Sequence, residues 1–513
     1  TGEGGTSEGD FHEALNVASV WGLPVIFIIE NNGYGLSTPV SEQYNCKSLS
    51  DRGKGYGIKS FKIDGNNILD VYNTVKNTVD LIQKKSQPIL IECNTFRMRG
   101  HEEASGTKYV PEKLMSKWAK KDPLDNYQKF LLKNNYLDSN DIDKYKCLIS
   151  DEIDKGLDIA FNTKELVPDT INEYNDVYRK YNFIEQKTIN NKVSNIRLVD
   201  AISNGLKQCM DKYDNLIIMG QDIAEYGGVF KITEGFLDLF GKERVRNTPI
   251  CESIILSMGL GLSVKGFKSV IEMQFADFVS SGFNAVVNNL AKTHYRWGQN
   301  VDVVVRMPTG ANVNAGPFHS QSNESWFTHT PGLKVVYPSS PADAKGLLIS
   351  SIEDPNPVMF FEHKFLYRSL YEDVPDSYYN IELGKAKRIL EGNDVTVITY
   401  GYGVHIAKEI LSSVNDISAD LIDLRTLVPL DKNMIFESVK KTNKVIILHE
   451  DTLTGGFGAE VSSLISEFCF EYLDAPIVRA ASMDTPVPFA VNLENQFLPK
   501  DRFKKKLLDL LDY

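Results

Sequence analysis

Long apolar runs and an excess of basic residues are both absent from this sequence. A helix that crosses a bilayer needs about 20 apolar residues, whereas runs such as Leu23–Ile29 are only long enough for a strand. Lys and Arg total 56 against 68 Asp and Glu, which gives a net charge of −12. Because nonspecific nucleic-acid binding needs a basic surface, we expect neither a membrane nor a nucleic-acid partner. The charge leaves open a small anionic ligand, which needs only a few local donors.

No Cys-x-x-Cys pair occurs among the six cysteines, which lie far apart. This spacing favours free thiols in a reducing compartment, and the expected location is cytoplasmic. The sequence also lacks a Met at residue 1 and opens directly on the glycine turn Gly2–Gly5. Such a turn normally follows a strand, so we expect the natural N-terminus to be missing, together with any targeting segment.

Short apolar runs alternate with helix-length stretches along most of the 513 residues, a length that suggests about three domains. The expected strands include Val25–Ile29, Ile89–Glu92, Leu216–Met219, Val270–Met273, Val301–Arg306, Val395–Tyr400, Leu421–Leu424 and Val445–Leu448. The expected helices include Phe11–Trp21, Leu69–Lys84, Leu198–Tyr213, Ile254–Val264 and Ala342–Ile352. This alternation predicts an α/β fold in which helices cover parallel sheets on both faces.

Two breaks in the alternation suggest domain boundaries. Residues 111–195 are rich in Lys, Asp, Glu and Asn, show helical periodicity in places and contain no strand run. A weaker seam lies at 373–379. We therefore expect an incomplete first module at 1–160, a linker at 161–194, a second module at 195–380 and a smaller third domain at 381–513.

The first motif is the run Gly2-Glu-Gly-Gly-Thr-Ser-Glu-Gly-Asp10, followed after a helix and a strand by Asn31-Asn-Gly-Tyr-Gly35. Glycines let the backbone approach a phosphate, and a helix N-terminus attracts it. Carboxylate, amide and carbonyl oxygens are ligands that suit Mg²⁺. Glycine turns without any ligand would explain the glycines alone, but not the acid and the Asn pair at this spacing.

This run resembles the diphosphate and metal motif of thiamine-diphosphate enzymes, and more narrowly the α subunit of the decarboxylating component of 2-oxoacid dehydrogenase complexes. The resemblance implies that Glu3, Asn32 and the carbonyl of Tyr34 bind Mg²⁺, and that Gly4 and Gly5 lie near the diphosphate. It also implies the thiamine-diphosphate-binding fold.

Two further motifs carry the resemblance. The loop Phe96–His101 follows a strand and contains Arg and Gly. The family has a similar loop whose His works at the cofactor, and this resemblance implies a catalytic role for His101.

The second of these motifs is Asn247-Thr-Pro-Ile-Cys-Glu252. From pattern alone Glu252 is a first-turn acid favoured by the helix dipole. The run resembles the β-subunit signature whose Glu protonates the pyrimidine ring of thiamine diphosphate, which makes Glu252 the expected catalytic acid.

The remaining motifs extend the resemblance through the second half of the chain. The segment 272–278 resembles the one that packs on the pyrimidine, which places Gln274 and Phe278 at the cofactor. Gln221 stands where the family often has Glu. The run Phe318-His-Ser-Gln-Ser322 implies that His319 faces the substrate, whereas His329 is expected to be structural. Residues 195–513 resemble an essentially complete β subunit that ends in a transketolase-like α/β domain.

The resemblance implies thiamine-diphosphate-dependent oxidative decarboxylation of a small-molecule 2-oxoacid, with acyl transfer to the lipoyl domain of a partner acyltransferase. The runs 361–368 and 449–457 look closer to the branched-chain type, so 3-methyl-2-oxobutanoate is the first expected substrate. Fusion of the two halves resembles an arrangement found in some bacteria, and we expect a homodimer. Four alternatives stay open: a pyruvate or an acetoin dehydrogenase component, a transketolase-type ketol transferase, and a non-catalytic truncated homologue.

Overall fold

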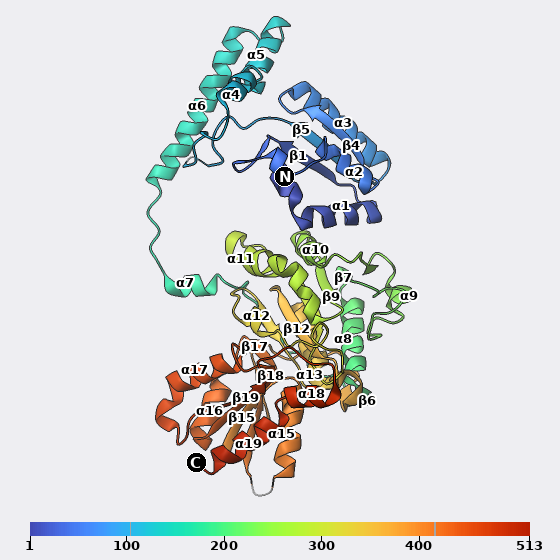
Figure 1. Cartoon of the computed structure of the whole chain (residues 1–513), viewed down its shortest axis with the longest axis vertical. Coiled ribbons are helices and arrows are strands. Elements are labelled where there is room, and N and C mark those ends of the chain that lie inside the picture. The colour runs from blue at the N-terminus through green and yellow to red at the C-terminus, as the bar shows by residue number, and fades with distance from the viewer. Residues whose placement is uncertain (103, 415–416) are drawn as a thin grey trace. The chain divides into compact units, whose positions relative to one another are not determined.

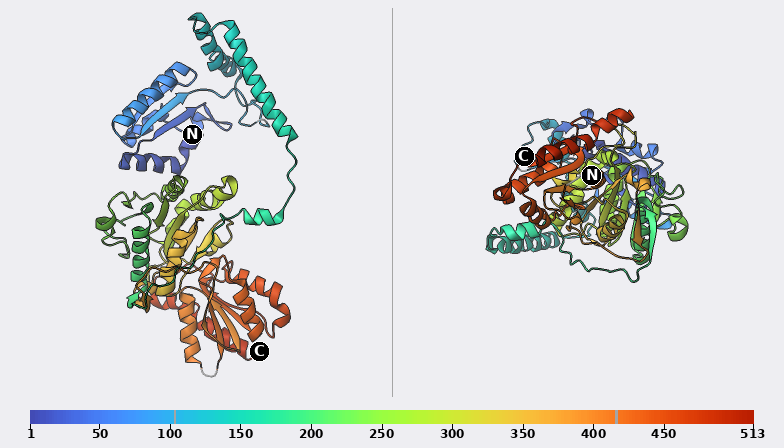
Figure 2. Two further views of the ribbon diagram at one scale, coloured as in Figure 1. Left: turned by 180° about the vertical axis from the view of Figure 1, so that it is seen from behind. Right: turned by 90° about the horizontal axis from the view of Figure 1, so that it is seen from below.

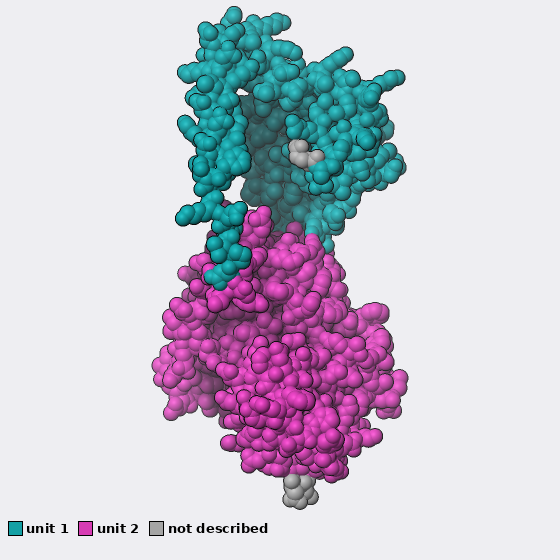
Figure 3. All heavy atoms as spheres, turned by 90° about the vertical axis from the view of Figure 1, so that its left-hand side faces the viewer, with its two compact units in different colours: residues 1–169 teal, residues 170–513 magenta. Residues whose placement is uncertain are grey.

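The computed structural model describes residues 1–102, 104–414 and 417–513. Contacts within the chain divide it into two compact units, residues 1–169 and 170–513, which Figure 3 colours separately. All six cysteines are free thiols. None of the helices in the described ranges is both long enough and apolar enough to cross a membrane.

Unit 1 is built on a parallel sheet with the strand order β1-β5-β4. Its strands are Ile26–Asn31 (β1), Lys59–Asp64 (β4) and Ile89–Asn94 (β5), with a short hairpin of Tyr34–Gly35 (β2) and Thr38–Pro39 (β3). Its helices are Gly9–Trp21 (α1), Arg52–Gly55 (α2), Ile68–Lys84 (α3), Glu112–Ala119 (α4), Pro123–Lys133 (α5) and Ser139–Asn162 (α6). Leu15 of α1 packs with Ile29 and Leu90 in a fully buried core, which fixes α1 on the sheet.

Unit 2 opens with helix α7 (Thr170–Asn175) and centres on a seven-stranded sheet with the order β17-β11-β12-β10-β9-β7-β8. These strands are Leu216–Gly220 (β7), Val245–Asn247 (β8), Lys268–Glu272 (β9), Val303–Thr309 (β10), Lys334–Val336 (β11), Val358–His363 (β12) and Thr426–Val428 (β17). All neighbours pair in parallel except β11 and β17. A separate two-stranded ribbon joins Val193–Arg197 (β6) to Tyr371–Pro375 (β13).

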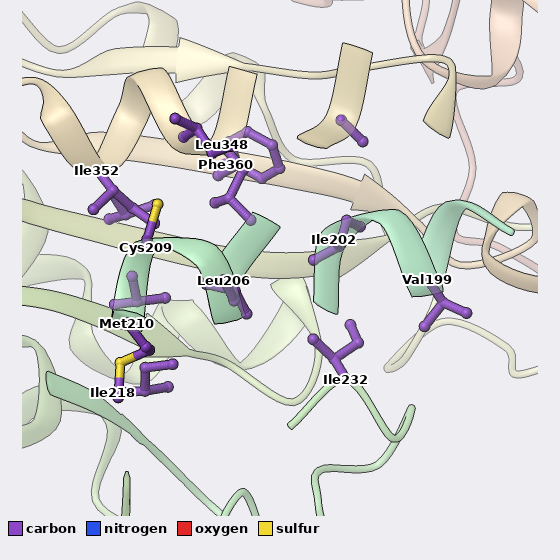
Figure 4. Packing of buried hydrophobic residues seen from close by; sticks show 14 of the residues in the cluster. Val199, Ile202, Leu206, Cys209, Met210, Ile218, Ile232, Leu348, Ile352 and Phe360 are labelled. Carbon is purple, nitrogen blue, oxygen red and sulfur yellow. The ribbon is translucent and has the colours of Figure 1, made fainter. Parts of the chain in front are cut away.

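Helices cover this sheet. They are Leu198–Lys212 (α8), Phe236–Phe240 (α9), Glu252–Val264 (α10), Ala291–Trp297 (α11), Ser325–Thr328 (α12), Pro341–Glu353 (α13) and Leu366–Ser369 (α14). Helices α8 and α13 pack against each other, and Figure 4 shows Ile202 and Leu206 of α8 in the same buried cluster as Leu348 of α13 and Phe360 of β12. Helix α10 packs on β9. Because Glu252 is the first residue of α10, this packing fixes the position of Glu252 relative to the sheet.

The C-terminal part of unit 2 is a second sheet with the order β14-β16-β15-β18-β19. Its strands are Lys387–Leu390 (β14), Val395–Thr399 (β15), Ala419–Asp423 (β16), Val445–Thr452 (β18) and Val478–Ser482 (β19). Its helices are Tyr402–Ser413 (α15), Lys432–Thr442 (α16), Gly458–Cys469 (α17), Val491–Phe497 (α18) and Lys500–Leu511 (α19). Helix α15 packs with α19 and α16 with α17. Right-handed crossovers place these two pairs on opposite faces of the sheet, as Figures 1 and 2 show.

The predicted α/β class is therefore confirmed. All eight expected strands are present, with ends displaced by a few residues. Several other strands lie outside the eight named above. In β4 (Lys59–Asp64) polar and apolar residues alternate, so it does not form a continuous apolar run, whereas β12 (Val358–His363) is a fully buried strand that opens on such a run. The expected helix Ile254–Val264 begins two residues earlier, at Glu252.

Arg306 of β10 lies fully buried between two carboxylates from the strands on either side. It donates to Glu362 of β12 through Nε at 2.7 Å and Nη2 at 2.8 Å, and to Glu272 of β9 through Nη1 at 2.7 Å. The hydroxyl of Tyr367 donates to the same Glu362 carboxylate at 2.5 Å. Burial alone would lower the pKa of Arg306, but the two carboxylates raise it above its usual value. This cation therefore stays charged within the sheet.

Substituting Glu362→Gln should destabilise the protein because it leaves Arg306 buried with half of its countercharge removed. Breaking a buried ion pair costs about 3 kcal/mol or more, so we expect a loss of about that size in the free energy of unfolding, measured by urea denaturation. Glu382→Gln, at an exposed glutamate of the same unit, should change it by less than about 0.5 kcal/mol. Equal stability of the two variants would contradict the account.

Lys364 directly follows β12 and is 7% exposed, and its Nζ donates to the carbonyl of Gly310 at 2.7 Å. Burial lowers its pKa to about 8, although the carboxylates of Asp277, Glu450 and Glu494 oppose the shift. An unfolded lysine titrates near pH 10.4. Between these two pH values the unfolded chain binds a proton that the folded chain does not, so folding becomes more favourable as the pH rises.

Wild-type protein should therefore gain stability relative to Lys364→Met between pH 7.5 and pH 10. We expect the difference between their free energies of unfolding to rise by roughly 2 kcal/mol over this range. Urea denaturation of both proteins at several pH values measures it. A difference that stays constant with pH would show that Lys364 keeps an ordinary pKa.

Candidate functional site

In unit 1 the turn at Glu3 meets the loop after β1. The Glu3 carboxylate is 1% exposed, and its Oε2 accepts a hydrogen bond from the amide of Asn32 at 2.9 Å. The side-chain Oδ1 of Asn32 in turn accepts from the amide of Tyr34 at 3.2 Å. The structure therefore brings together the three residues that the family resemblance assigns to Mg²⁺, all beside the carboxyl end of β1.

Gly4 allows the backbone of this turn to lie against that of β2, and Gly5 leaves room for the side chain of Thr1. A Cβ atom on Gly4 would lie 3.0 Å from Cα of Gly35, and one on Gly5 would lie 2.5 Å from Oγ1 of Thr1. Helix α1 begins at Gly9, after a short 3-10 turn over Gly4–Ser7. The helix therefore begins two residues before the expected range Phe11–Trp21.

The loop that carries His101 is connected to the same region of unit 1. Arg97 donates through Nη2 to the carbonyl of Leu36 at 2.5 Å and to the hydroxyl of Tyr109 at 2.8 Å. The Tyr109 ring lies 5.5 Å from the ring of Tyr34. His101 is exposed, and its Nδ1 lies 3.4 Å from Nη1 of Arg97. Arg97 thus connects the His101 loop to the segment that follows Asn32.

In unit 2 the candidate residues follow the carboxyl ends of neighbouring parallel strands. Gln221 follows β7, Glu252 follows β8, Gln274 follows β9 and His319 lies in the loop after β10. Open parallel sheets bind ligands at this edge. The strand order, which the sequence alone does not provide, is what makes these four positions neighbours along the edge.

Glu252 and Gln221 are in direct contact. Nε2 of Gln221 donates to Oε1 of Glu252 at 3.0 Å, and Gln221 is 8% exposed. Glu252 also lies in the first turn of α10, where the helix dipole favours a carboxylate. The first-turn interpretation and the interpretation as a site residue are therefore compatible. An amide at residue 221 gives Glu252 a hydrogen-bond donor where a second carboxylate would repel it.

Two aromatic rings pack against the imidazole of His319. Its ring lies 4.9 Å from the ring of Phe275 and 5.5 Å from that of Phe278, both edge-on. Nearby in the sequence, Nε2 of Gln274 donates to Oδ2 of Asp222 at 3.0 Å. The structure therefore brings Phe278 to His319 and connects Gln274 to the strand end that carries Gln221.

Sequence reasoning missed Phe275 and Asp222. Phe275 lies between the expected residues Gln274 and Phe278, and Asp222 directly follows Gln221, so their proximity in sequence to expected residues could have indicated both.

Two other histidines lie outside this cluster. His329 is exposed on the wall of a cavity of about 540 Å³. Nδ1 of His12 lies 2.7 Å from the Tyr56 hydroxyl, and burial together with Arg52 lowers its pKa.

The donor sets fit the cofactor that the resemblance implies. A carboxylate, an amide oxygen and a backbone carbonyl in unit 1 are hard ligands suited to Mg²⁺ and a diphosphate. Within the described ranges no group of three or more His, Cys, Asp and Glu could hold a metal alone, so a metal here needs the amide, carbonyl and phosphate oxygens. In unit 2 the carboxylate of Glu252 and the rings of Phe278 and His319 suit an aminopyrimidine.

Comparison with known families accounts for most of the chain. Residues 1–169 match the family described as dehydrogenase E1 component. Residues 194–369 match the transketolase pyrimidine-binding domain, and residues 384–502 match the transketolase C-terminal domain.

The second half is similar to curated β subunits. It is 42% identical over 339 residues to 2-oxoisovalerate dehydrogenase subunit beta 2 of Arabidopsis thaliana, covering 65% of this chain and 92% of that protein. It is 42% identical to 2-oxoisovalerate dehydrogenase subunit beta of Bacillus subtilis, covering 61% of this chain and 98% of that protein. It is also 39% identical to pyruvate dehydrogenase E1 component subunit beta of Rickettsia felis, covering 60% and 95%.

A solved structure titled split gene transketolase, inactive beta4 tetramer, matches with a TM-score of 0.52 at 20% identity. It covers 62% of this chain and 99% of its own, and it shows the fold alone. The family profiles and the β-subunit relatives carry the assignment. The chain belongs to the thiamine-diphosphate-dependent E1 components of the 2-oxoacid dehydrogenases, with an α-subunit-like part fused to a β-subunit-like part.

Proposed function

We propose that this protein catalyses the oxidative decarboxylation of a branched-chain 2-oxoacid, 3-methyl-2-oxobutanoate first among them, and passes the acyl group to the lipoyl domain of a partner acyltransferase. The single observation that carries the proposal is the hydrogen-bonded Glu252–Gln221 pair at the carboxyl edge of a parallel sheet. The motifs at 361–368 and 449–457 and the relatives named for 2-oxoisovalerate support the branched-chain substrate.

Pyruvate is the second candidate substrate, and relatives named for pyruvate dehydrogenase favour it. Pockets for apolar side chains discriminate by only about 1–3 kcal/mol per methylene. The preference for one of these substrates over the other is therefore a matter of degree in kcat/KM. The test is a panel of 2-oxoacids and a ketose phosphate with an artificial electron acceptor. We expect the highest kcat/KM for 3-methyl-2-oxobutanoate. Highest turnover of the ketose phosphate would contradict the proposed class.

No amino-acid side chain can stabilise the carbanion that such a decarboxylation produces, and bound thiamine diphosphate supplies that chemistry. Glu252 would hold a proton at a ring nitrogen of the pyrimidine. The Gln221 amide fixes the Oε1 side of the carboxylate and so orients it. His319, packed against Phe275 and Phe278, would face the substrate and move protons as a general acid–base group.

In unit 1, Glu3, Asn32 and the Tyr34 carbonyl would bind Mg²⁺ and, through it, the diphosphate, with Gly4 and Gly5 beside the phosphates. His101 would act at the cofactor. We further propose that the protein is a homodimer, since closed two-fold assemblies are the commonest, and that the two groups of cofactor ligands in one site come from different copies of the chain.

Glu252→Gln should remove the carboxylate that holds the pyrimidine proton while preserving the shape of the side chain. We expect kcat for 2-oxoacid decarboxylation to fall by about 100-fold or more, measured with an artificial acceptor. Exposed Glu382 provides the matched control, and Glu382→Gln should keep wild-type activity. If Glu252→Gln kept most of the activity, the assignment of this carboxylate would be wrong.

The proposed assembly predicts the mass of two chains by light scattering at micromolar protein concentration. Adding thiamine diphosphate with Mg²⁺ should strengthen the dimer, because a ligand that binds only the assembled state stabilises it. A monomer that binds the cofactor with undiminished affinity would refute the dimeric arrangement.

A further inference from the structure

The loop that carries His319, residues 310–322, is held at its two ends by its own domain. Oγ1 of Thr309 donates to the carbonyl of Gln321 at 2.7 Å, and Nζ of Lys364 donates to the carbonyl of Gly310 at 2.7 Å. Oδ1 of Asp277 accepts from the amide of Gln321 at 3.2 Å and from its side chain at 2.9 Å. These contacts close the base of the loop and leave its middle to other elements.

Two buried carboxylates of the C-terminal domain bind the middle of the loop. Oε1 of Glu450, at the end of β18, accepts from the amide of Ala311 at 2.6 Å. Glu494 of α18 accepts from the amides of Val313 at 3.3 Å and Asn314 at 3.1 Å. Glu450 is 5% exposed and Glu494 2% exposed. Each carboxylate thus makes charge-assisted hydrogen bonds to the backbone, more than 100 residues along the chain from its partners.

The backbone of the loop is shaped to receive Glu494. Asn312 and Asn314 both have positive φ, 66° and 56°, a conformation that costs most residues energy and that Asn tolerates best. Consecutive amides in alternating conformations form a concave nest that binds anions. Here the amides of Val313 and Asn314 form that nest and the anion is the Glu494 side chain.

Further contacts from the C-terminal domain reach the same stretch. Nδ2 of Asn312 donates to the hydroxyl of Tyr402 at 3.1 Å. Ala311 is fully buried in a small apolar cluster with Val487 and Phe497. Gly316 has φ 72°, and a Cβ atom there would lie 2.3 Å from the ring of Phe489, so only glycine allows that ring to pack on the loop.

We propose that the C-terminal domain positions His319, with Glu494 and Glu450 as positioning residues that act through the loop backbone. The contacts reach residues 311–316, and His319 lies between them and the anchored end at Gln321. A domain that supplies no residue to the proposed chemistry thus sets the place of a substrate-facing imidazole. The contacts of Glu494 and Glu450 with the loop do not depend on the proposed function, whereas their effect on turnover rests on the proposed role of His319.

The experiment compares the full-length protein with Glu494→Gln and Glu494→Met, using Glu467→Gln, an exposed glutamate of α17, as the matched control. Hydrogen exchange is followed in peptides covering 310–322 and, as an internal reference, in the buried helix α13. Loss of the charged acceptor for the amides of Val313 and Asn314 should raise exchange in the loop about tenfold or more. Exchange in α13 and in the control variant should stay within about twofold of wild type.

The kinetic readout separates positioning from general stability. We expect kcat/KM for the 2-oxoacid to fall about tenfold or more in Glu494→Gln, with the dissociation constant for thiamine diphosphate within about twofold of wild type. Tyr402→Phe, which removes only the hydroxyl that accepts from Asn312, should give smaller changes in the same direction. It keeps the test available if the Glu494 variants do not fold.

Three results would overturn the inference: unchanged exchange in the loop, exchange raised equally in the loop and in α13, or faster loop exchange with kcat/KM unchanged. Failure of the proposed function is distinguishable from these. If wild-type protein turned over no 2-oxoacid while the loop still exchanged faster in Glu494→Gln, the hold on the loop would stand and the assigned reaction would fall.

Discussion

The parallel pairing of β7, β8, β9 and β10 is the constraint on which the candidate site in unit 2 depends. Parallel strands end at one edge of their sheet, so residues that follow four separate strands become neighbours. The buried Arg306–Glu362–Glu272 network crosses three of the strands of this sheet beneath that edge. A charge paired across strands is costly to displace, and this network therefore holds β9, β10 and β12 in register, which aligns Gln274 after β9 with the loop after β10 that carries His319.

Sequence reasoning predicted the features that local pattern encodes. Continuous apolar runs predicted eight of the strands. The glycine-acid turn with the Asn pair predicted a set of oxygen donors that lie together within unit 1, where Glu3 accepts from the amide of Asn32. The resemblance to a known family selected Glu252 from other first-turn acids, which pattern alone does not distinguish. Strand β4 was not predicted, because the alternation of polar and apolar residues was not counted as a strand signal.

What the sequence did not reveal are contacts between residues distant along the chain. Glu494 lies 180 residues from the Asn314 amide that it binds, and no motif near residue 494 indicates a role at a loop in another domain. Gln221 could be seen to depart from the family pattern, but only the folded chain shows its amide donating to Glu252. In both cases strand order and domain packing, rather than local composition, create the interaction.

The central proposal is that thiamine diphosphate binds through Mg²⁺ held by Glu3, Asn32 and Tyr34 of one copy of the chain and through the carboxylate of Glu252 of another copy. Calorimetric titration of the protein with thiamine diphosphate, with and without Mg²⁺, tests it most directly. The account predicts one cofactor per chain, binding that disappears when the metal is chelated, and affinity weakened at least about tenfold in Glu3→Gln, since that variant loses a charged metal ligand. Folded protein that takes up no cofactor in the presence of Mg²⁺, or binds it equally well without the metal, would contradict it.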